Sequence, residues 1–344
     1  MNPWRSAFGR SARVAMITLG VAALLWRPSS LWVEQAYVNG AYPYWEHLLF
    51  PISSALPWSL GDIVVLAGVG LIAWRLVRRD WLGALAVAAA YAFWFEAGWG
   101  WNYDRAPIEA RTAYDQSRIT TRAVDALRAR AIAQMNRLAP LAHARAATPF
   151  DVEDLYASWL PVVQAGGDGW VPLTGVPKPT LADPFMAATG TSGYINPFAL
   201  DVHLASDLLW FERPFDLAHE WSHVAGYARE DEANFLAIVS CTRSNSPVVQ
   251  YSGWLELFLY LPPQARYSKA TFVPLVWGDF AAIRERNRRY VNLSLASFSW
   301  RTYNTYLKTN HVASGVQNYD EVTRLYVGIA RDRAGLPVPA GSGR

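Results

Sequence analysis

Long apolar runs bounded by polar residues fill most of the first hundred positions, whereas the rest of the chain has a mixed pattern. Each apolar core is nearer ~12–15 residues than the ~20 that span a bilayer comfortably, but flanking arginines and tryptophans can extend such segments to the interfaces. Buried helices of a soluble protein are the alternative, although three in succession would be unusual there. We therefore predict a membrane anchor, residues 1–102, with three transmembrane helices at about residues 14–30, 60–77 and 81–101.

Basic residues give this anchor an orientation. Arginines precede the first apolar segment and lie between the second and third, and such residues favour the cytoplasmic side. An odd number of spans then places residues 103–344 on the outer face of the membrane. A cleaved signal peptide is an alternative for the first segment, but no clear small-x-small cleavage site follows it, so we expect an uncleaved anchor. The arginines are Arg5, Arg10, Arg13, Arg75, Arg78 and Arg79.

Residues 103–344 show mostly helical periodicity. Thr120 and Thr121 can cap a helix to about Leu138, and Asp151 can cap another through Val163. The best strand character lies in residues 187–198, which predicts a small sheet. The predicted fold class is mainly α, with transmembrane helices followed by a domain with a small sheet. Further helical segments follow Asp231, Tyr251, Ser268, Ser297 and Asp320.

Composition excludes some classes of function. The net charge is only +3 and no basic block is present, so nucleic-acid binding has little support. Hydrophobic residues make up 52% of the chain, and the excess lies at the N-terminus, as a lipid bilayer partner requires. Cys241 is the only cysteine, which excludes an intramolecular disulfide and a cysteine-based metal cluster.

The segment His219-Glu220-Trp221-Ser222-His223 is an H-E-x-x-H pattern. On a helix its two histidines lie one turn apart, so both imidazoles can bind one Zn²⁺, and Glu220 is placed to take a proton from a water that the metal activates. Pro214 and Asp216 suit the first turn of that helix. Gly226 suits the position after its end, where the chain reverses at positive φ. The sequence therefore predicts a zinc site on a short, capped helix.

A tetrahedral catalytic zinc site needs a third protein ligand. A metzincin would need histidine where this chain has Arg229, so a carboxylate from the acidic run of residues 230–232 is expected instead. The run Glu232-Ala233-Asn234 resembles the E-A-N ligand helix of the ImmA/IrrE-type metallopeptidases, and this resemblance implies Glu232 as the ligand, with Glu230 as the alternative. The simpler explanation is that these acids only stabilise a helix start.

Longer matches connect the chain with one family. They are Pro57 to Asp62, Trp99 to Tyr103, Glu230 to Phe235, Tyr251 to Gly253 and Tyr306 to Asn310, together with the H-E-x-x-H motif. The chain resembles the bacterial domain-of-unknown-function 3810 family of membrane-anchored H-E-x-x-H proteins. The resemblance implies a multi-pass protein of the bacterial inner (cytoplasmic) membrane with an extracytoplasmic, zincin-like α+β metallopeptidase domain. His203 and His311 stand where the family has other residues, so no role is carried over to them.

The expected function is a gluzincin-like zinc metallopeptidase that hydrolyses a protein or peptide substrate, with Glu220 as general base. The expected metal ligands are His219, His223 and Glu232. Two alternatives stay open: a zinc amidase acting on cell-wall material, and a non-catalytic membrane scaffold that retains the metal site. The residue that would stabilise an oxyanion is undecided among Tyr194, Tyr251, Arg229, His203 and His311.

Overall fold

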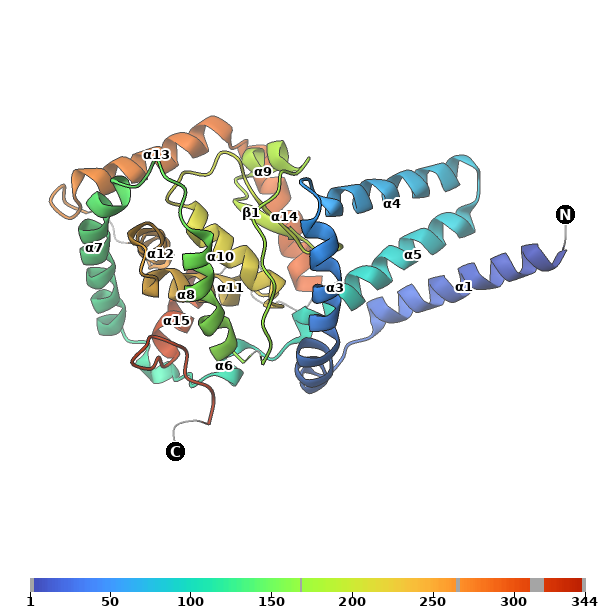
Figure 1. The fold of residues 1–344 in the computed structure, drawn as a ribbon, viewed down its shortest axis with the longest axis horizontal. Helices are drawn as coiled ribbons and strands as arrows, with labels where there is room; N and C mark the ends of the chain where they lie inside the picture. The colour runs from blue at the N-terminus through green and yellow to red at the C-terminus, as the bar shows by residue number, and fades with distance from the viewer. Residues whose placement is uncertain (1–2, 168, 264–266, 310–318, 342–344) are drawn as a thin grey trace. The chain divides into compact units, whose positions relative to one another are not determined.

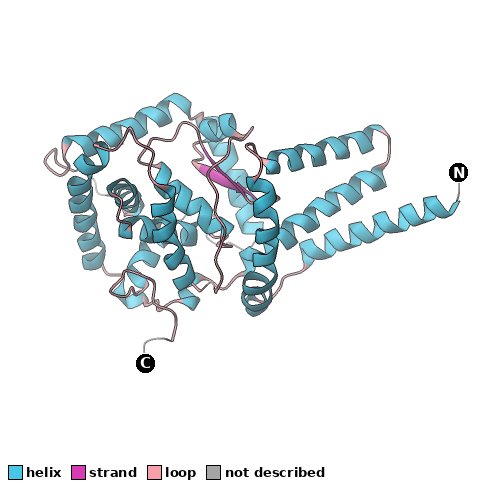
Figure 2. Cartoon of the chain, viewed as in Figure 1, coloured by secondary structure: helices cyan, strands magenta, loops and turns pink. Residues whose placement is uncertain are grey.

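The computed structural model describes residues 3–167, 169–263, 267–309 and 319–341. Helices hold 67% of the residues and strands 4%, and the strands form one two-stranded sheet (Figure 2). The prediction of a mainly α fold with a small sheet is therefore confirmed.

The chain divides into two compact units, and the division is not a single cut. The first unit is Met1–Arg105 with two short later segments, Lys178–Thr180 and Ile195–Asp201. The second unit is Ala106–Pro177, Leu181–Tyr194 and Val202–Arg344. The sequence predicted a boundary after residue 102, but nothing in it indicated that later segments return to the first unit.

Three long helices form the first unit: α1 (Pro3–Leu25), α4 (Leu60–Val77) and α5 (Trp81–Gly98). Helix α5 packs against both others, and Gly20 of α1 lies so close to the backbone of Ala89 that any side chain there would collide with it. Ser59 caps α4 by accepting from the Asp62 amide, and Asp80 caps α5 by accepting from the Gly83 amide. These caps explain why the two helices begin where the apolar runs begin.

Two of these helices, α4 and α5, are each long and apolar enough to cross a membrane. The N-terminal helix meets the same test only together with the segment Ser30–Ser54, from which it is bent by 108°. That segment contains α2 (Ser30–Trp32), the π-helical η1 (Val33–Ala41) and α3 (Tyr42–Ser54), none of which the sequence predicted. Among the described residues there are therefore two membrane-spanning candidates, or three if the bent pair forms one span.

Charged groups mark one end of this helix bundle. Asp80, at the start of α5, accepts from Arg13 of α1 at 2.7 Å and from Arg75 of α4 at 2.9 Å. Residues from three helices therefore meet at one carboxylate. This contact brings Arg13 of α1 and Arg75 of α4 together at the start of α5.

A second carboxylate, the buried Asp201, holds the late segments within the first unit. Its Oδ1 accepts from Lys178 Nζ at 2.9 Å and from the Ser53 hydroxyl, and its Oδ2 accepts from the Gly61 amide at 2.8 Å and from the Ser59 hydroxyl at 3.3 Å. Four donors from three separate stretches of chain thus converge on one buried side chain. We call this group the Asp201 cluster.

Helices build almost all of the second unit. Thr120 caps α7 and Asp151 caps α8 through their side-chain oxygens, as predicted, and α7 continues past Leu138 to His143. The unit contains α6 (Ile108–Arg111), η3 (Gln116–Arg118), α7 (Thr121–His143), α8 (Val152–Ala165), α9 (Asp183–Thr189), α10 (Arg213–Val224), α11 (Glu230–Arg243), α12 (Pro247–Tyr260), α13 (Pro274–Tyr290), α14 (Leu293–Thr309) and α15 (Tyr319–Gly328). The short η2 (Gly100–Asp104) precedes this unit.

The sheet is shorter than predicted. Within the described ranges only β1 (Gly193–Asn196) and β2 (Asp201–Leu204) are strands, joined by a tight turn in which the Leu200 amide donates to the Asn196 carbonyl. The expectation of strand from residue 187 was wrong, because residues 187–189 end helix α9. Asp183 and Pro184 suit the first turn of that helix, and Gly190, at φ +72°, ends it in the left-handed region.

The core of the second unit surrounds α10 and α11. Trp159 of α8 and Trp221 of α10 are fully buried with ring centroids 5.6 Å apart, and the Trp159 indole donates to the Ser222 hydroxyl at 3.0 Å. Helices α11 and α12 meet closely at Gly253, where an added Cβ would come within 2.5 Å of the Cys241 Cβ. This packing fixes the position of the H-E-x-x-H helix.

Candidate metal centre

Helix α10 carries the H-E-x-x-H residues between two defined ends. Pro214 occupies its first turn, where the missing amide hydrogen is not needed, and the Phe215 amide donates to the Ser252 hydroxyl at 3.1 Å. At the other end Gly226, at φ +83°, reverses the chain as predicted. The Gly226 amide donates to the His223 carbonyl and the Tyr227 amide to the Ser222 carbonyl, which is the pattern of a Schellman cap.

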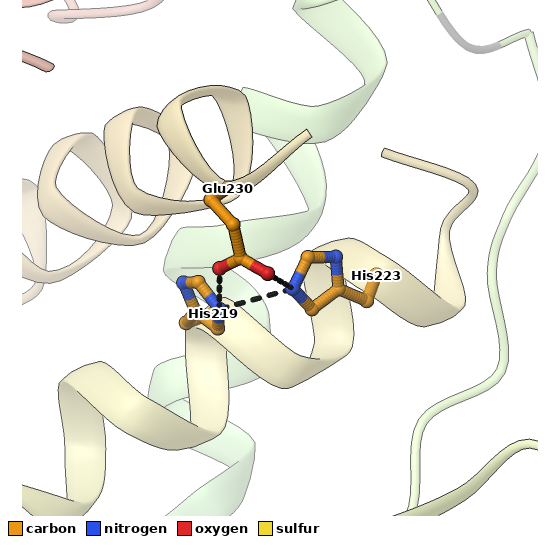
Figure 3. A group of neighbouring side chains, drawn as sticks. All are labelled: His219, His223 and Glu230. Atoms are coloured by element: carbon orange, nitrogen blue, oxygen red, sulfur yellow. Dashed lines mark hydrogen bonds and ion pairs between the residues drawn. The ribbon is translucent and has the colours of Figure 1, made fainter. Parts of the chain in front are cut away.

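The structure brings three of the sequence-predicted groups together, as Figure 3 shows. His219 and His223 lie one turn apart on α10, and their Nε2 atoms are 3.0 Å apart. Glu230, in the first turn of α11, places its Oε2 3.3 Å from His219 Nε2 and its Oε1 3.7 Å from His223 Nε2. All three side chains point from two helices towards one position.

These separations suit zinc. Ligand atoms ~2.0–2.2 Å from a tetrahedral ion lie about 3.3–3.6 Å from one another. The three donor pairs, at 3.0, 3.3 and 3.7 Å, lie around that range. Two imidazole nitrogens and one carboxylate oxygen are also a ligand set that catalytic zinc sites use. The donor chemistry and the spacing therefore both fit Zn²⁺.

Neighbouring groups orient both imidazoles. His223 Nδ1 lies 2.7 Å from the Tyr227 carbonyl, which can only accept, so Nδ1 carries the hydrogen and the Nε2 lone pair faces the site. The Asn234 side chain forms a hydrogen bond with His219. Asn234 is four residues after Glu230, so the two residues share one face of α11. The Schellman cap thus has a second effect, because it is what brings the Tyr227 carbonyl back to His223.

Strong coupling between the three groups shifts their pKa values. Burial raises the pKa of Glu230, but the two histidines outweigh this and hold it well below its usual range. Burial lowers the pKa of His219. Burial also lowers the pKa of His223, but Glu230 and Glu220 outweigh that and raise it to about 9. An anionic Glu230 therefore faces a positive charge, and a divalent cation can supply that charge instead of a proton.

Glu220 lies beside this group and is not one of the three converging side chains. It is buried, and its Oε2 has no hydrogen-bond partner among the described residues. Burial, Glu230 and Asp216 raise its pKa to about 8 against the lowering by His223. Gly193, at the start of β1, leaves it room, because an added Cβ there would lie 2.6 Å from Glu220 Oε1.

Glu232, the expected third ligand, lies away from the two histidines, and the alternative, Glu230, lies next to them instead. The Oε1 of Glu232 accepts from the Ile108 amide at 2.9 Å, and its Oε2 accepts from Arg111 at 3.2 Å. Successive helical residues turn by about 100°, so Glu232 lies roughly 200° around α11 from Glu230. It therefore faces α6 and not the histidines.

Arg111 is a residue that the sequence did not single out. Its guanidinium donates to Glu232 and to the Gly166 carbonyl, and it lies 4.9 Å from the centre of the Tyr227 ring. The Tyr227 hydroxyl donates to the Val163 carbonyl at 2.9 Å. Glu232 and Arg111 thus support the residue whose carbonyl orients His223. No local signal connects Arg111 with the motif, since more than a hundred residues separate them.

The residues considered for oxyanion stabilisation lie in different places. Tyr194 and His203 have ring centroids 4.7 Å apart, and Tyr194 directly follows Gly193, which contacts Glu220. Tyr251 is buried and donates to Asp279. Arg229 precedes α11, with its Nε 4.0 Å from Glu232 Oε1. His311 lies outside the described residues. Only the Tyr194–His203 pair is tied to the surroundings of Glu220.

Comparison with known proteins gives one match. The sequence profile of the family described as "Protein of unknown function (DUF3810)" matches residues 37–327, a stretch that includes α4, α5 and the whole candidate metal centre. No curated protein and no solved structure matches the chain. Because the profile spans most of the sequence, the chain belongs to the DUF3810 family, as its motifs predicted.

Proposed function

We propose that this protein is a membrane-anchored, zinc-dependent metallopeptidase with a zincin-like catalytic unit. The observation that carries the proposal is the convergence of His219, His223 and Glu230 on one position, at separations that suit tetrahedral zinc. The buried carboxylate of Glu220 beside them supports a catalytic role over a structural one. A structural site has four protein ligands, whereas these three leave a fourth position for a water or a substrate.

In this proposal each residue has a separate task. His219, His223 and Glu230 hold Zn²⁺, which supplies Lewis acidity to a water and to the scissile carbonyl. Glu220 accepts the proton of the attacking water and passes it to the leaving amine. Its burial removes competing solvent, and the absence of a side chain at Gly193 keeps one of its oxygens accessible to small groups.

The neighbouring strand supports an extended peptide as the substrate. In the part of the chain that the structure describes, β1 pairs as a strand only with β2, so β1 forms one edge of a two-stranded sheet. An extended peptide can add to such an edge through main-chain hydrogen bonds. Gly193 connects this strand to Glu220, which would bring a bound peptide bond towards the base.

Metal content and hydrolysis, measured on the purified full-length protein in lipid nanodiscs, test the proposal. We expect about one zinc per chain and hydrolysis of members of a peptide library. Glu220→Gln should keep the zinc, because this residue is not a ligand, and should reduce hydrolysis by on the order of 10²–10⁴-fold.

Glu285→Gln provides the control, since Glu285 is exposed on α13 and pairs only with nearby Arg288 in the structure described. It should change neither readout. Hydrolysis that persists in Glu220→Gln would overturn the mechanism. Zinc without any peptide hydrolysis would instead favour a non-peptide amide substrate or a scaffold.

A further inference from the structure

Helices α9 and α14 of the second unit expose several large apolar side chains. The two helices pack together, with the Asn292 amide before α14 donating to the Ala188 carbonyl of α9 at 2.9 Å, and they lie side by side in Figure 1. Leu293 is 80% exposed and Leu181 is 73% exposed. Single exposed leucines are ordinary, but a group on two packed helices needs an explanation. The exposed group, which we call the α9–α14 face, comprises Phe185, Leu293 and Trp300 on these two helices, with Leu181 just before α9 and Tyr290 at the end of α13.

Two of these residues lie on the same side of α14. Leu293 and Trp300 are seven residues apart, which brings them to the same side of the helix two turns apart. Ala296, between them, is buried and marks the adjoining side that packs inward. On α9, Phe185 lies one turn before the buried Thr189. The exposed apolar groups therefore border the buried contact between the helices.

The charges around the α9–α14 face are basic. Helix α14 contains no acidic residue and carries an exposed Arg301. At the end of α13 the Arg289 guanidinium lies 5.3 Å from the centre of the exposed Tyr290 ring. The one acidic residue of α9, Asp183, accepts hydrogen bonds from the Ser206 amide and hydroxyl. Aromatic, apolar and basic side chains together suit the interfacial layer of an anionic bilayer.

Chain continuity places this face within reach of a membrane. Leu181 directly follows Thr180, whose hydroxyl donates to Asp62 in the first turn of the candidate span α4 at 3.2 Å. Consecutive Cα atoms are about 3.8 Å apart, so Leu181 is one such step from a residue held at the end of that span. Ala106, where the second unit begins, is only eight residues beyond the end of α5 at Gly98.

We infer that the α9–α14 face lies in the lipid interface, so that the second unit contacts the membrane surface in addition to being tethered to it. The apolar side chains would enter the headgroup region, and Arg289 and Arg301 would meet lipid phosphates. We choose a bilayer surface as the partner of this face because the short connection between α5 and Ala106 keeps the second unit close to the membrane that α5 would span. The inference concerns the whole unit and does not depend on zinc or on peptidase activity.

Site-directed fluorescence quenching in full-length protein tests the inference. Cys241→Ala removes the only cysteine and adds no atoms to the close approach of α11 and α12 at Gly253. Single cysteines at Leu293, Trp300 and Leu181 then receive a small fluorophore, and the protein is placed in nanodiscs of phosphatidylethanolamine and phosphatidylglycerol. Nitroxide lipids labelled near the headgroup should reduce the fluorescence at all three positions, and more than lipids labelled deep in the acyl chain.

Asp125→Cys, on the exposed side of α7, is the matched control, because α7 lies far from α9 and α14 in Figure 1. Its fluorophore should lose little intensity with either lipid. Equal quenching at Asp125 and at the three test positions would overturn the inference. A second outcome would also overturn the inference: the fluorophores at the test positions are shielded from water, but nitroxide lipids do not quench them. In that case a second copy of the chain covers the face.

Discussion

Two clusters of buried charged side chains in this molecule differ in how completely their carboxylates are supplied with hydrogen-bond and ion-pair partners. In the Asp201 cluster, four donors surround one carboxylate. Burial raises the pKa of Asp201, but Ser53, Gly61 and Lys178 outweigh this and hold it below its usual range. Such a carboxylate is a stable anion whose charge is already balanced by hydrogen-bond donors and a cation.

The carboxylates of the candidate metal centre have fewer such partners. This centre gathers two histidines and two carboxylates in a small buried volume, and one oxygen of Glu220 has no partner among the described residues. Burial raises the pKa of Glu220 to about 8, whereas Asp201 has a lowered pKa. Buried polar groups are normally satisfied, so an incompletely matched cluster indicates a site at which something binds or reacts. The contrast separates a structural charge cluster from a candidate functional one within the same chain.

The largest expected effect comes from removing a histidine. His219→Ala or His223→Ala should abolish stoichiometric zinc, because two remaining ligands cannot hold the ion tightly. Metal analysis of the purified full-length variants measures this. Lys178→Met, in the Asp201 cluster, should leave zinc at the wild-type level. Full zinc occupancy in both histidine variants would remove the distinction between the two clusters.

A matched pair of glutamates sharpens the comparison. Glu230→Gln should weaken zinc binding by more than the ~10–100-fold typical of an outer-shell partner, because the anionic ligand is lost. Glu232→Gln should weaken it by no more than that range, since Glu232 supports Arg111 and lies away from the ion. Competition with a fluorescent chelator gives both affinities. The reverse order would return the ligand role to Glu232.

A smaller effect is expected in the Asp201 cluster, and on stability alone. Lys178→Met leaves the Asp201 carboxylate buried without its cation, which should cost about 3–5 kcal/mol. Thermal unfolding in detergent should therefore begin at a lower temperature, with hydrolysis per folded molecule unchanged. Replacing the exposed Lys269 by Met controls for the loss of a positive charge. A Lys178 variant as stable as wild type would mean that the cluster is not a structural tie.

Local patterns predicted much of this molecule. The caps at Thr120 and Asp151, the reversal at Gly226 and the H-E-x-x-H helix all depend on interactions within a few residues. The spans α4 and α5 follow from apolar composition in the same way. For residues 187–189 the strand character of the segment was misleading, because Pro184 and Gly190 mark the ends of helix α9.

The third ligand needed information that the sequence does not carry. Glu230 and Glu232 both lie in the first turn of α11, and composition cannot tell which one faces α10. The helical period shows that they cannot both do so, and it places Glu230 on the face of Asn234. The position of Glu232 is set by its partner Arg111, which comes from a distant part of the chain. Long-range contacts of this kind appear only in the folded structure.

The return of Ile195–Asp201 to the first unit has a consequence for synthesis at the ribosome. Asp201 is made roughly a hundred residues after α5, which takes about 5–20 s at ordinary elongation rates of ~5–20 residues/s. Until then Ser53, Ser59 and Gly61 lack the carboxylate that joins them in the finished unit. The helices of the first unit therefore remain without this buried tie until the segment Ile195–Asp201 has been translated.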